Sequence, residues 1–205
     1  KSVSTHFETL NFKKNESIFN EGDSPEWFYI VAKGEVKILK HTLVGKDIIL
    51  EIMSPGDIFG GVAVLDKRPF PASALAMEQI TVIRISRSKL IKIMEDFPII
   101  KLEIVKYFSD RLRDAHETLK NIATERVEKR VASLLLKLAE KAGVEDSGYK
   151  KINFPLTRQE ISEMVGTTVE TAIRTTSKLQ KKGMIKSSEG RIMIKTSALQ
   201  KFLEE

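Results

Sequence analysis

The sequence predicts an α+β protein in which an antiparallel β jelly roll is followed by a long helix and a helical domain that ends in a β-hairpin. Up to about residue 97, short apolar stretches alternate with Gly, Asp and Pro, a pattern typical of antiparallel strands and turns. Farther along, apolar residues recur at helical spacing. We therefore expect three segments: a β domain at 1–97, a helix and hinge at 98–124, and a third domain at 125–205.

Five apolar stretches in the first segment predict strands. Their short lengths and nearly regular spacing favour a jelly roll or sandwich over a helical fold. Gly34 and Gly45 lie at two of the intervening corners, where glycine accepts a positive φ without steric cost. The predicted strands are 17–19, 27–31, 36–39, 47–52 and 81–85.

The composition excludes several classes of protein. The 205 residues contain no cysteine, so disulfides, thiolate zinc sites, catalytic thiols and cysteine-ligated iron–sulfur clusters are excluded. No apolar run approaches the roughly 20 residues that cross a bilayer, and no signal-peptide pattern opens the chain. We therefore expect a cytoplasmic protein without a membrane partner. The first residue is Lys1 rather than Met, which leaves open whether residues precede it.

The second segment predicts a long helix that begins near Pro98, because proline suits the first turn of a helix. Its apolar residues recur at alternating spacings of three and four, which is a heptad period. So narrow a stripe could pack against the protein's own sheet, but the heptad period favours a parallel partner helix and therefore a homodimer. The predicted dimer seam consists of Val105, Phe108, Leu112, Ala115, Leu119 and Ile122.

The third segment begins and ends with elements that its patterning predicts. An amphipathic helix is expected from Val127 and ends near Gly143. Residues 143–151 are polar and predict a loop. Residues 186–195 predict a β-hairpin with its tip at residues 189–190.

Between these elements lies the pattern of two helices joined by a tight turn. Thr157 and Glu160 form a predicted capping box, in which the hydroxyl accepts a backbone N–H and the carboxylate reaches back. Gly166 closes the helix that this box opens. Thr168 starts a second helix that runs to Lys182. This is the helix-turn-helix unit, whose second helix fits the DNA major groove, and the following hairpin would be its wing.

The charge distribution agrees with a polyanion partner for the third segment only. Residues 125–205 contain 16 Lys and Arg against 11 Asp and Glu, a net charge of +5. Residues 1–124 contain 18 against 17, a net charge of +1. A basic domain on a nearly neutral body indicates contact with nucleic acid through that domain.

Several stretches in this order resemble the cyclic-AMP receptor protein / fumarate-nitrate regulator (CRP/FNR) superfamily of bacterial transcription factors. The resemblance covers nearly the whole chain, and the order and spacing of the stretches are more specific than any one of them. They are Gly22-Asp23, Tyr29-Ile30, Gly34, the Pro-Gly-Asp-Ile-Phe-Gly run at 55–60, the long helix, and residues 156–161 leading to 168–174.

This resemblance implies a cyclic-nucleotide-binding-like effector domain, a dimerisation helix and a winged helix-turn-helix DNA-binding domain. It also implies a homodimeric transcription regulator that binds a palindromic DNA operator, contacts RNA polymerase and responds to a small-molecule effector. Members of the family include activators, but the sequence leaves open whether this protein activates or represses, and which genes it regulates.

Glu170 and Arg174 stand at the positions that contact bases in the family, with Val169 before them. They are four residues apart and therefore share one helical face. Arginine can donate twice to guanine and glutamate can accept from cytosine, whereas the alternative role is a surface ion pair worth about 0.2–0.5 kcal/mol. Val169 resembles the fumarate-nitrate branch, which suggests a TTGA-like half-site, although Ile173 replaces the usual Ser of that branch. Contacts to DNA phosphates are expected from Thr157, Arg158, Thr168, Thr171, Thr175, Lys178 and Lys181.

The effector region departs from the cyclic-nucleotide sensors of the family. In those proteins the Phe-Gly stretch continues into Glu, which binds the ribose, and Arg-Ser or Arg-Thr binds the phosphate about ten residues later. Here Gly61 replaces the Glu, Pro71 replaces the Arg, and Arg68 lies three residues before the phosphate position. A buried phosphate without a donor is costly, so cyclic AMP is not expected. The predicted effector pocket comprises Phe59, Gly60, Gly61, Val62, Pro71, Ala72 and Ser73.

The identity of the effector stays open. Some relatives bind haem to sense nitric oxide or carbon monoxide, and His6, His41 and His116 are candidate ligands together with six Met. An apolar ligand between the jelly roll and the long helix is an equal alternative.

Two other classes of protein are alternatives to a DNA-binding regulator. A regulatory subunit without DNA-binding activity would use the β domain to control a partner, but the helix-turn-helix pattern argues against it. A jelly-roll enzyme would need clustered metal ligands inside the barrel, and three scattered histidines do not supply them. We therefore expect no enzyme activity, no catalytic residue and no metal site.

Overall fold

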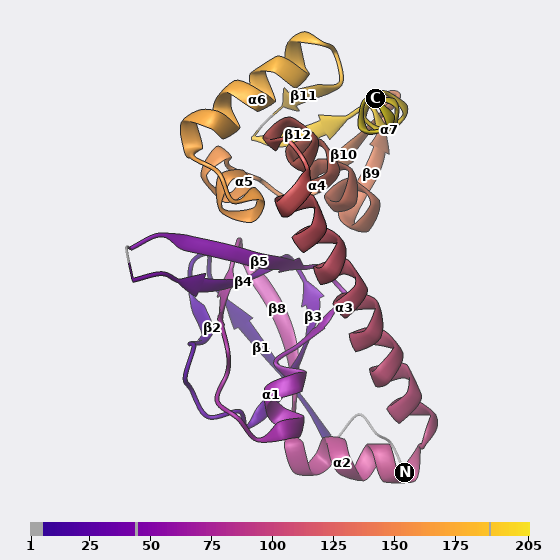
Figure 1. The fold of residues 1–205 in the computed structure, drawn as a ribbon. Coiled ribbons are helices and arrows are strands. Elements are labelled where there is room, and N and C mark those ends of the chain that lie inside the picture. The colour runs from indigo at the N-terminus through magenta and orange to yellow at the C-terminus, as the bar shows by residue number, and fades with distance from the viewer. Residues whose placement is uncertain (1–5, 44, 189) are drawn as a thin grey trace. The chain divides into compact units, whose positions relative to one another are not determined.

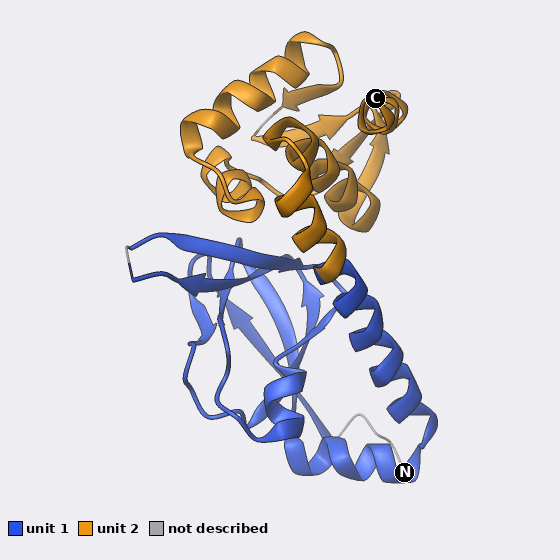
Figure 2. Ribbon diagram, in the orientation of Figure 1, with its two compact units in different colours: residues 1–115 blue, residues 116–205 orange. Residues whose placement is uncertain are grey.

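The structure, a computed structural model, describes residues 6–43, 45–188 and 190–205. The chain divides into two compact units, Lys1–Ala115 (unit 1) and His116–Glu205 (unit 2) (Figure 2). Lys1 and Glu189, the latter at the predicted hairpin tip, lie outside the described residues. Within the described part of the chain, no helix combines the length and apolar character needed to span a bilayer.

Two antiparallel sheets form the framework of unit 1 (Figure 1). The strands are β1 (Phe7–Phe12), β2 (Ser17–Phe19), β3 (Trp27–Lys33), β4 (Val36–His41), β5 (Asp47–Met53), β6 (Ile58–Phe59), β7 (Ser73–Ala76) and β8 (Ile80–Ser86). One sheet has the order β1-β8-β3-β6 and the other the order β2-β7-β4-β5. The antiparallel β domain that the sequence predicts is confirmed.

Aromatic side chains fill the space between these sheets. The rings of Phe19 and Phe70 stack with centroids 3.8 Å apart, and those of Tyr29 and Phe59 stack at 5.2 Å. Phe19 joins the two pairs, with its ring 5.6 Å from Tyr29 and 6.0 Å from Phe59. All four side chains are buried, and aromatic rings bury more apolar surface than any other side chains. The barrel therefore has a packed aromatic interior.

Gly34 shows why one of the barrel corners requires glycine. It joins β3 to β4 at φ 76°, in the left-handed region that residues with a Cβ rarely adopt. A Cβ at this position would lie 2.8 Å from Ile80 Cγ2 and 3.1 Å from the Gln79 carbonyl oxygen. Both the backbone angle and the close approach of β8 exclude a larger residue.

Three helices accompany the sheets: α1 (Gly61–Asp66), α2 (Arg87–Asp96) and α3 (Ile99–Thr124). The predicted long helix is α3, but α1 and α2 were not predicted from the sequence. Neither has a side-chain N-cap hydrogen bond, and α2 buries only Leu90 and Ile93. Both therefore lack the caps and the long apolar repeat that identify a helix in a sequence.

Unit 2 packs helices on a small antiparallel sheet (Figure 1). Its elements after α3 are α4 (Val127–Ala142), β9 (Gly143–Asp146), β10 (Tyr149–Ile152), α5 (Arg158–Val165), α6 (Val169–Lys181), β11 (Ile185–Ser188), β12 (Arg191–Ile194) and α7 (Thr196–Glu204). The sheet order is β11-β12-β10-β9. The predicted helix-turn-helix corresponds to α5 and α6, and the predicted wing to β11 and β12.

Two features of unit 2 differ from the sequence prediction. Residues 143–151, predicted as a loop, form the hairpin β9–β10 together with Ile152, and β10 also pairs with β12. Ser147 and Gly148 both have positive φ, as the tight turn of a hairpin requires, but their flanks lack alternating apolar residues. The last helix, α7, was not predicted either, since a single residue, Leu199, supplies its buried anchor.

Candidate nucleic-acid interface

The helix α5 begins with the capping box that the sequence predicts. The backbone N–H of Glu160 donates to Thr157 Oγ1 at 3.1 Å, and the backbone N–H of Thr157 donates to Glu160 Oε2 at 2.9 Å. At the other end Gly166 adopts φ 67° as the C-cap. These two ends fix the length of α5 and hence the position of the turn into the next helix.

The helix α6 has its own N-cap and a clear division between a buried and an exposed face. The backbone N–H of Thr171 donates to Thr168 Oγ1 at 3.2 Å, so α6 begins immediately after the turn. Its inner face consists of the buried residues Ala172, Thr175, Thr176 and Leu179. The opposite face of α6 is exposed to solvent at Glu170, Ile173, Arg174 and Ser177.

Glu170 and Arg174 both lie on this outer face and are exposed. They are one turn apart near the N-terminal end of α6. The guanidinium of Arg174 donates to Thr171 Oγ1 at 3.2 Å, which orients it along the helix. Val169, the third predicted base-contacting residue, is half-buried in the first turn. The geometry that base contacts require, two long polar side chains on one accessible helical face, is present.

The residues predicted to contact phosphates lie in different environments. Thr157, Thr168 and Lys181 are exposed, and Thr171 is half-buried. Thr175 is only 5% exposed and belongs to the inner face of α6, so that its hydroxyl is the least accessible of the set.

Arg158 connects α5 to the wing. Its guanidinium donates to Ser187 Oγ on β11 at 3.2 Å. Partial burial lowers the pKa of this guanidinium, and arginine still carries its charge at neutral pH. The side chain thus places a fixed positive charge where the helix-turn-helix meets the hairpin.

A pocket of about 400 Å³ lies where the start of α4 meets α6. No local sequence pattern marks the α4 side of this pocket, because residues more than 40 positions apart meet there. Lys178, a predicted phosphate contact, donates to Glu128 Oε1 at 2.6 Å within it. We call it the α4–α6 pocket, and its lining is Arg126, Val127, Glu128, Thr171, Arg174, Thr175 and Lys178.

The predicted effector-pocket residues differ in how far they are buried. Phe59 is part of the aromatic core, whereas Val62 and Pro71 are exposed. Gly60 is half-buried, and Gly61, Ala72 and Ser73 are buried. Ser73 Oγ accepts a hydrogen bond from the backbone N–H of Glu21 at 2.9 Å, which ties β7 to a neighbouring turn.

The position of Gly61 is too crowded for a side chain. A Cβ there would lie 2.7 Å from Phe28 Cε2 and 3.0 Å from Phe108 Cζ. The Glu that cyclic-nucleotide sensors carry at this position therefore does not fit without displacing two rings.

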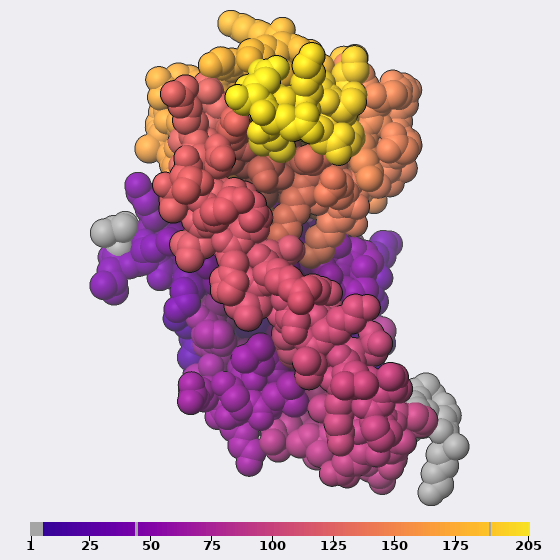
Figure 3. Space-filling view, turned by 45° about the vertical axis from the view of Figure 1, so that its right-hand side comes forward, coloured from indigo at the N-terminus to yellow at the C-terminus, as the bar shows by residue number. Residues whose placement is uncertain are grey.

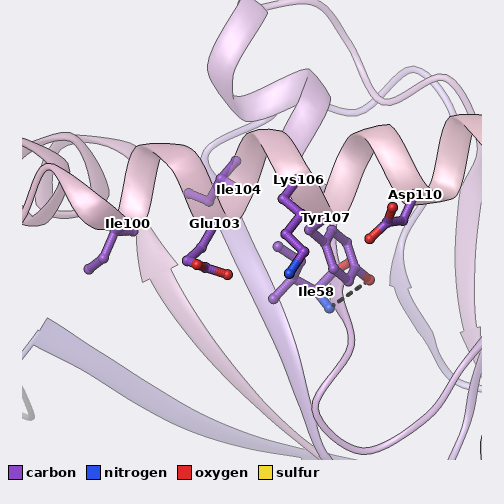
Figure 4. A pocket seen from close by; sticks show the side chains of 7 residues that line it. All are labelled: Ile58, Ile100, Glu103, Ile104, Lys106, Tyr107 and Asp110. Carbon is purple, nitrogen blue, oxygen red and sulfur yellow. Dashed lines mark hydrogen bonds between the residues drawn. The ribbon is translucent and has the colours of Figure 1, made fainter.

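The long helix α3 is joined to the barrel by polar contacts (Figure 4). The Tyr107 hydroxyl donates to the Ile58 carbonyl at 3.0 Å and accepts from the Ile58 N–H at 3.1 Å. Arg111 donates to the same carbonyl at 3.2 Å and forms an ion pair with Glu51. Burial raises the pKa of Tyr107 to about 12. A cavity of about 320 Å³ beside these contacts is lined by Ile58, Ile100, Glu103, Ile104, Lys106, Tyr107 and Asp110.

The predicted dimer seam is mostly exposed on α3. Val105, Leu112, Leu119 and Ile122 are 45–66% exposed, and Ala115 is exposed as well. The space-filling view shows α3, coloured rose, running uncovered along the surface (Figure 3). Phe108 differs, since it is half-buried against the core of unit 1. We call five large apolar residues that are exposed on this helix after its first turn the α3 stripe: Leu102, Val105, Leu112, Leu119 and Ile122.

The three histidines considered as haem ligands belong to different parts of the secondary structure. His41 ends β4, where its Nδ1 is 2.6 Å from Asp47 Oδ1, and His116 is exposed on α3. His6 is half-buried and precedes β1. Among the described residues, no group of three or more His, Asp or Glu is arranged to hold a metal ion.

Comparisons with known proteins bear on both units. The family model of the cyclic nucleotide-binding domain matches residues 9–97, and that of the Crp-like helix-turn-helix domain matches residues 129–202. The chain is 27% identical to the CRP-like cAMP-activated global transcriptional regulator of Mycobacterium tuberculosis over 196 residues, which cover 96% of this chain and 88% of the relative. It is 29% identical to the anaerobic regulatory protein of Bacillus subtilis over 184 residues, covering 89% and 77% of the two chains.

Among solved structures, FixK2 from Bradyrhizobium japonicum has the same fold. It superposes with a TM-score of 0.84 at 24% identity, covering 95% of this chain and 96% of FixK2. This likeness shows the fold, and the two family models, which match residues 9–97 and 129–202, show the family. The chain belongs to the CRP/FNR superfamily of transcription regulators, with a cyclic nucleotide-binding-like domain and a Crp-like helix-turn-helix domain.

Proposed function

We propose that this protein is a sequence-specific DNA-binding regulator that acts as a homodimer on a palindromic operator. The single observation that carries the proposal is the exposed pair Glu170 and Arg174 on the outer face of α6. In a helix-turn-helix the second helix enters the major groove, so this face meets the base edges.

The chemistry of the pair supports specific recognition. Arg174 offers two donors for O6 and N7 of guanine, and Glu170 accepts from the amino group of cytosine or adenine. Val169 contributes an apolar contact at the start of the helix. The TTGA-like half-site is a hypothesis that follows from Val169. Ile173, which replaces the Ser of the fumarate-nitrate branch, is exposed and can therefore change the bases that are read.

The homodimer is supported by the α3 stripe. Exposed apolar residues at heptad spacing are unusual on a helix unless a partner helix covers them. A two-fold dimer would present two copies of α6 to DNA, with half-sites about 34–36 Å apart or a multiple of that distance. Contact with RNA polymerase and an activating role are part of the proposal on the basis of the family.

The effector is proposed to be a molecule other than cyclic AMP. Gly61 cannot be replaced by the ribose-binding Glu without a clash with Phe28, and Pro71 has no donor for a phosphate. The property named for the Mycobacterium relative, activation by cyclic AMP, is therefore not transferred to this chain. Haem and an apolar ligand remain the alternatives.

The route from effector to DNA would run through α3. Tyr107 and Arg111 bind the backbone of Ile58, two residues before Gly60, so a shift of this segment moves α3 with it. A hinge at residues 123–125 would then change how the helix-turn-helix domains meet DNA. An effector can act in this way only if it binds the two arrangements with different affinity.

Arg174→Ala tests the function. An operator is first selected with the wild-type protein from a pool of random palindromic duplexes, and gel shifts then compare the variants. We expect Arg174→Ala to lose the preference for the operator and to keep weak, salt-sensitive binding to any duplex. Lys201→Ala, which removes one positive charge from α7, should keep the preference. An unchanged operator preference in Arg174→Ala, or no DNA binding by the wild type, would contradict the proposal.

A further inference from the structure

The α4–α6 pocket has an unusual balance of charge. Three cationic side chains, Arg126, Arg174 and Lys178, line it together with a single carboxylate, Glu128. The hydroxyl-bearing side chains of Thr171 and Thr175 complete the polar lining. Two more cations than anions, with hydroxyl groups between them, are suited to a small dianionic or monoanionic oxyanion.

Glu128 forms an ion pair with one of these cations, Lys178. Its Oε1 accepts from Lys178 Nζ at 2.6 Å, and the two side chains are 36% and 54% exposed. Ion pairs that are this accessible to water are weak and are readily exchanged for another anion. The ion pair thus keeps the Lys178 ammonium at the pocket, and an incoming anion can replace Glu128 as its partner.

The pocket adjoins the face that is proposed to read bases. Arg174 belongs both to the pocket lining and to the outer face of α6, and Thr171 links the two through its hydrogen bond from Arg174. Every oxyanion on a DNA duplex close to a contacted base is a backbone phosphate. A duplex seated on α6 therefore brings phosphates to the mouth of this pocket.

We propose that the α4–α6 pocket binds a DNA backbone phosphate through Arg126 and Lys178, and that Glu128 competes with this phosphate for Lys178. The inference rests on the proposed function and adds a second element, α4, to the DNA-binding surface. Glu128 then acts as a built-in competitor that weakens binding to all sequences alike, because a phosphate contact carries no sequence information. The affinities for the operator and for other DNA fall by the same factor, so Glu128 sets the overall strength of DNA binding and leaves the sequence preference unchanged.

The test uses the full-length protein and a random-sequence DNA duplex, so no operator is required. Fluorescence anisotropy measures affinity between about 50 and 200 mM salt, a range in which phosphate contacts dominate the salt dependence. We expect Glu128→Gln to bind about two- to fivefold tighter than the wild type. Lys178→Gln should bind more weakly, with a slope of log affinity against log salt that is smaller by about 0.9 for each protomer bound. Arg126→Gln should act in the same direction.

The control and the double variant separate this role from a general effect of charge. Glu140→Gln makes the same change of charge in the last turn of α4, about 18 Å along the helix from Glu128 and beyond the screening length, and should leave affinity unchanged. In Glu128→Gln/Lys178→Gln the gain from the first substitution should fall by at least half.

Three results would overturn the inference. They are equal affinities of Glu128→Gln and Glu140→Gln, an unchanged salt slope in both Lys178→Gln and Arg126→Gln, and a full gain from Glu128→Gln without Lys178. Any of these, with Arg174→Ala still losing its operator preference, refutes the phosphate pocket and leaves the proposed function standing. A wild-type protein that binds no duplex refutes both.

Discussion

At Gly61 the chain has no side chain, and the space that a Cβ would take is already occupied. Phe28 and Phe108 approach the built Cβ position to 2.7 and 3.0 Å. Phe108 comes from α3, so the same crowding packs the long helix against the barrel. Gly61 therefore has two consequences. The chain lacks the Glu that binds the ribose in cyclic-nucleotide sensors, and α3 can pack closely against the barrel.

Gly61→Glu, which restores the residue of those sensors, should destabilise the protein and fail to create a cyclic AMP site. Overpacking of a well-packed core costs about 1–3 kcal/mol, so the free energy of unfolding should fall by this amount in chemical denaturation. Val62→Glu, one position later at an exposed residue, is the matched control and should cost less than about 0.5 kcal/mol. A Gly61→Glu variant of unchanged stability that binds cyclic AMP in calorimetry would contradict the packing argument.

The elements α5 and α6 follow from short-range signals, and so they were predictable. Thr157, Glu160 and Gly166 lie within ten residues of each other and fix both ends of α5. This local geometry determines where α6 begins and therefore where Glu170 and Arg174 lie on it. For this reason the sequence was sufficient to predict that they share an outward face. The exposed face of α6, which is the proposed recognition surface, is thus encoded locally.

Thr157→Ala tests how much the capping box of α5 contributes to the stability of the protein. The substitution removes the acceptor for the Glu160 N–H, and loss of an N-cap costs about 0.5–2 kcal/mol. We expect a lower melting temperature in calorimetry for Thr157→Ala. Thr157→Ser keeps the hydroxyl acceptor and should melt close to the wild type. Equal melting temperatures for the two variants would show that the capping box adds nothing.

Other elements depend on contacts that no short stretch reveals. The hairpin β9–β10 is stabilised by pairing of β10 with β12, about 40 residues later, and α7 by the burial of Leu199. The α4 side of the α4–α6 pocket is hidden for the same reason, since Glu128 and Lys178 are 50 positions apart. Phe108 fits the heptad period equally well as a seam residue, and only the packed structure places it against the barrel.

At the scale of the whole molecule, the α3 stripe and the excess of basic residues at 125–205 fit one proposal, a DNA-binding homodimer. The residues 125–205 that carry the net charge of +5 lie within unit 2, and one helix-turn-helix reads one half-site. In the proposed homodimer, joining two copies through α3 would make the second half-site contact intramolecular, which would raise overall affinity about 10²–10⁴-fold without any new contact. Operator binding should therefore depend on residues of α3 that touch no DNA.

Leu112→Lys puts this dependence to the test. Two copies of the substitution would place like charges at the centre of the predicted seam, so sedimentation should report a monomer in place of a dimer. Operator affinity should fall by at least about 100-fold, even though the added lysine by itself favours DNA binding. Glu117→Gln changes the charge by the same amount on the polar side of α3, where Glu117 pairs with Lys120 at 2.6 Å, and should remain a dimer with normal affinity. If Leu112→Lys also sediments as a dimer and binds the operator normally, the stripe is not the dimer interface and the apolar residues on α3 need another partner.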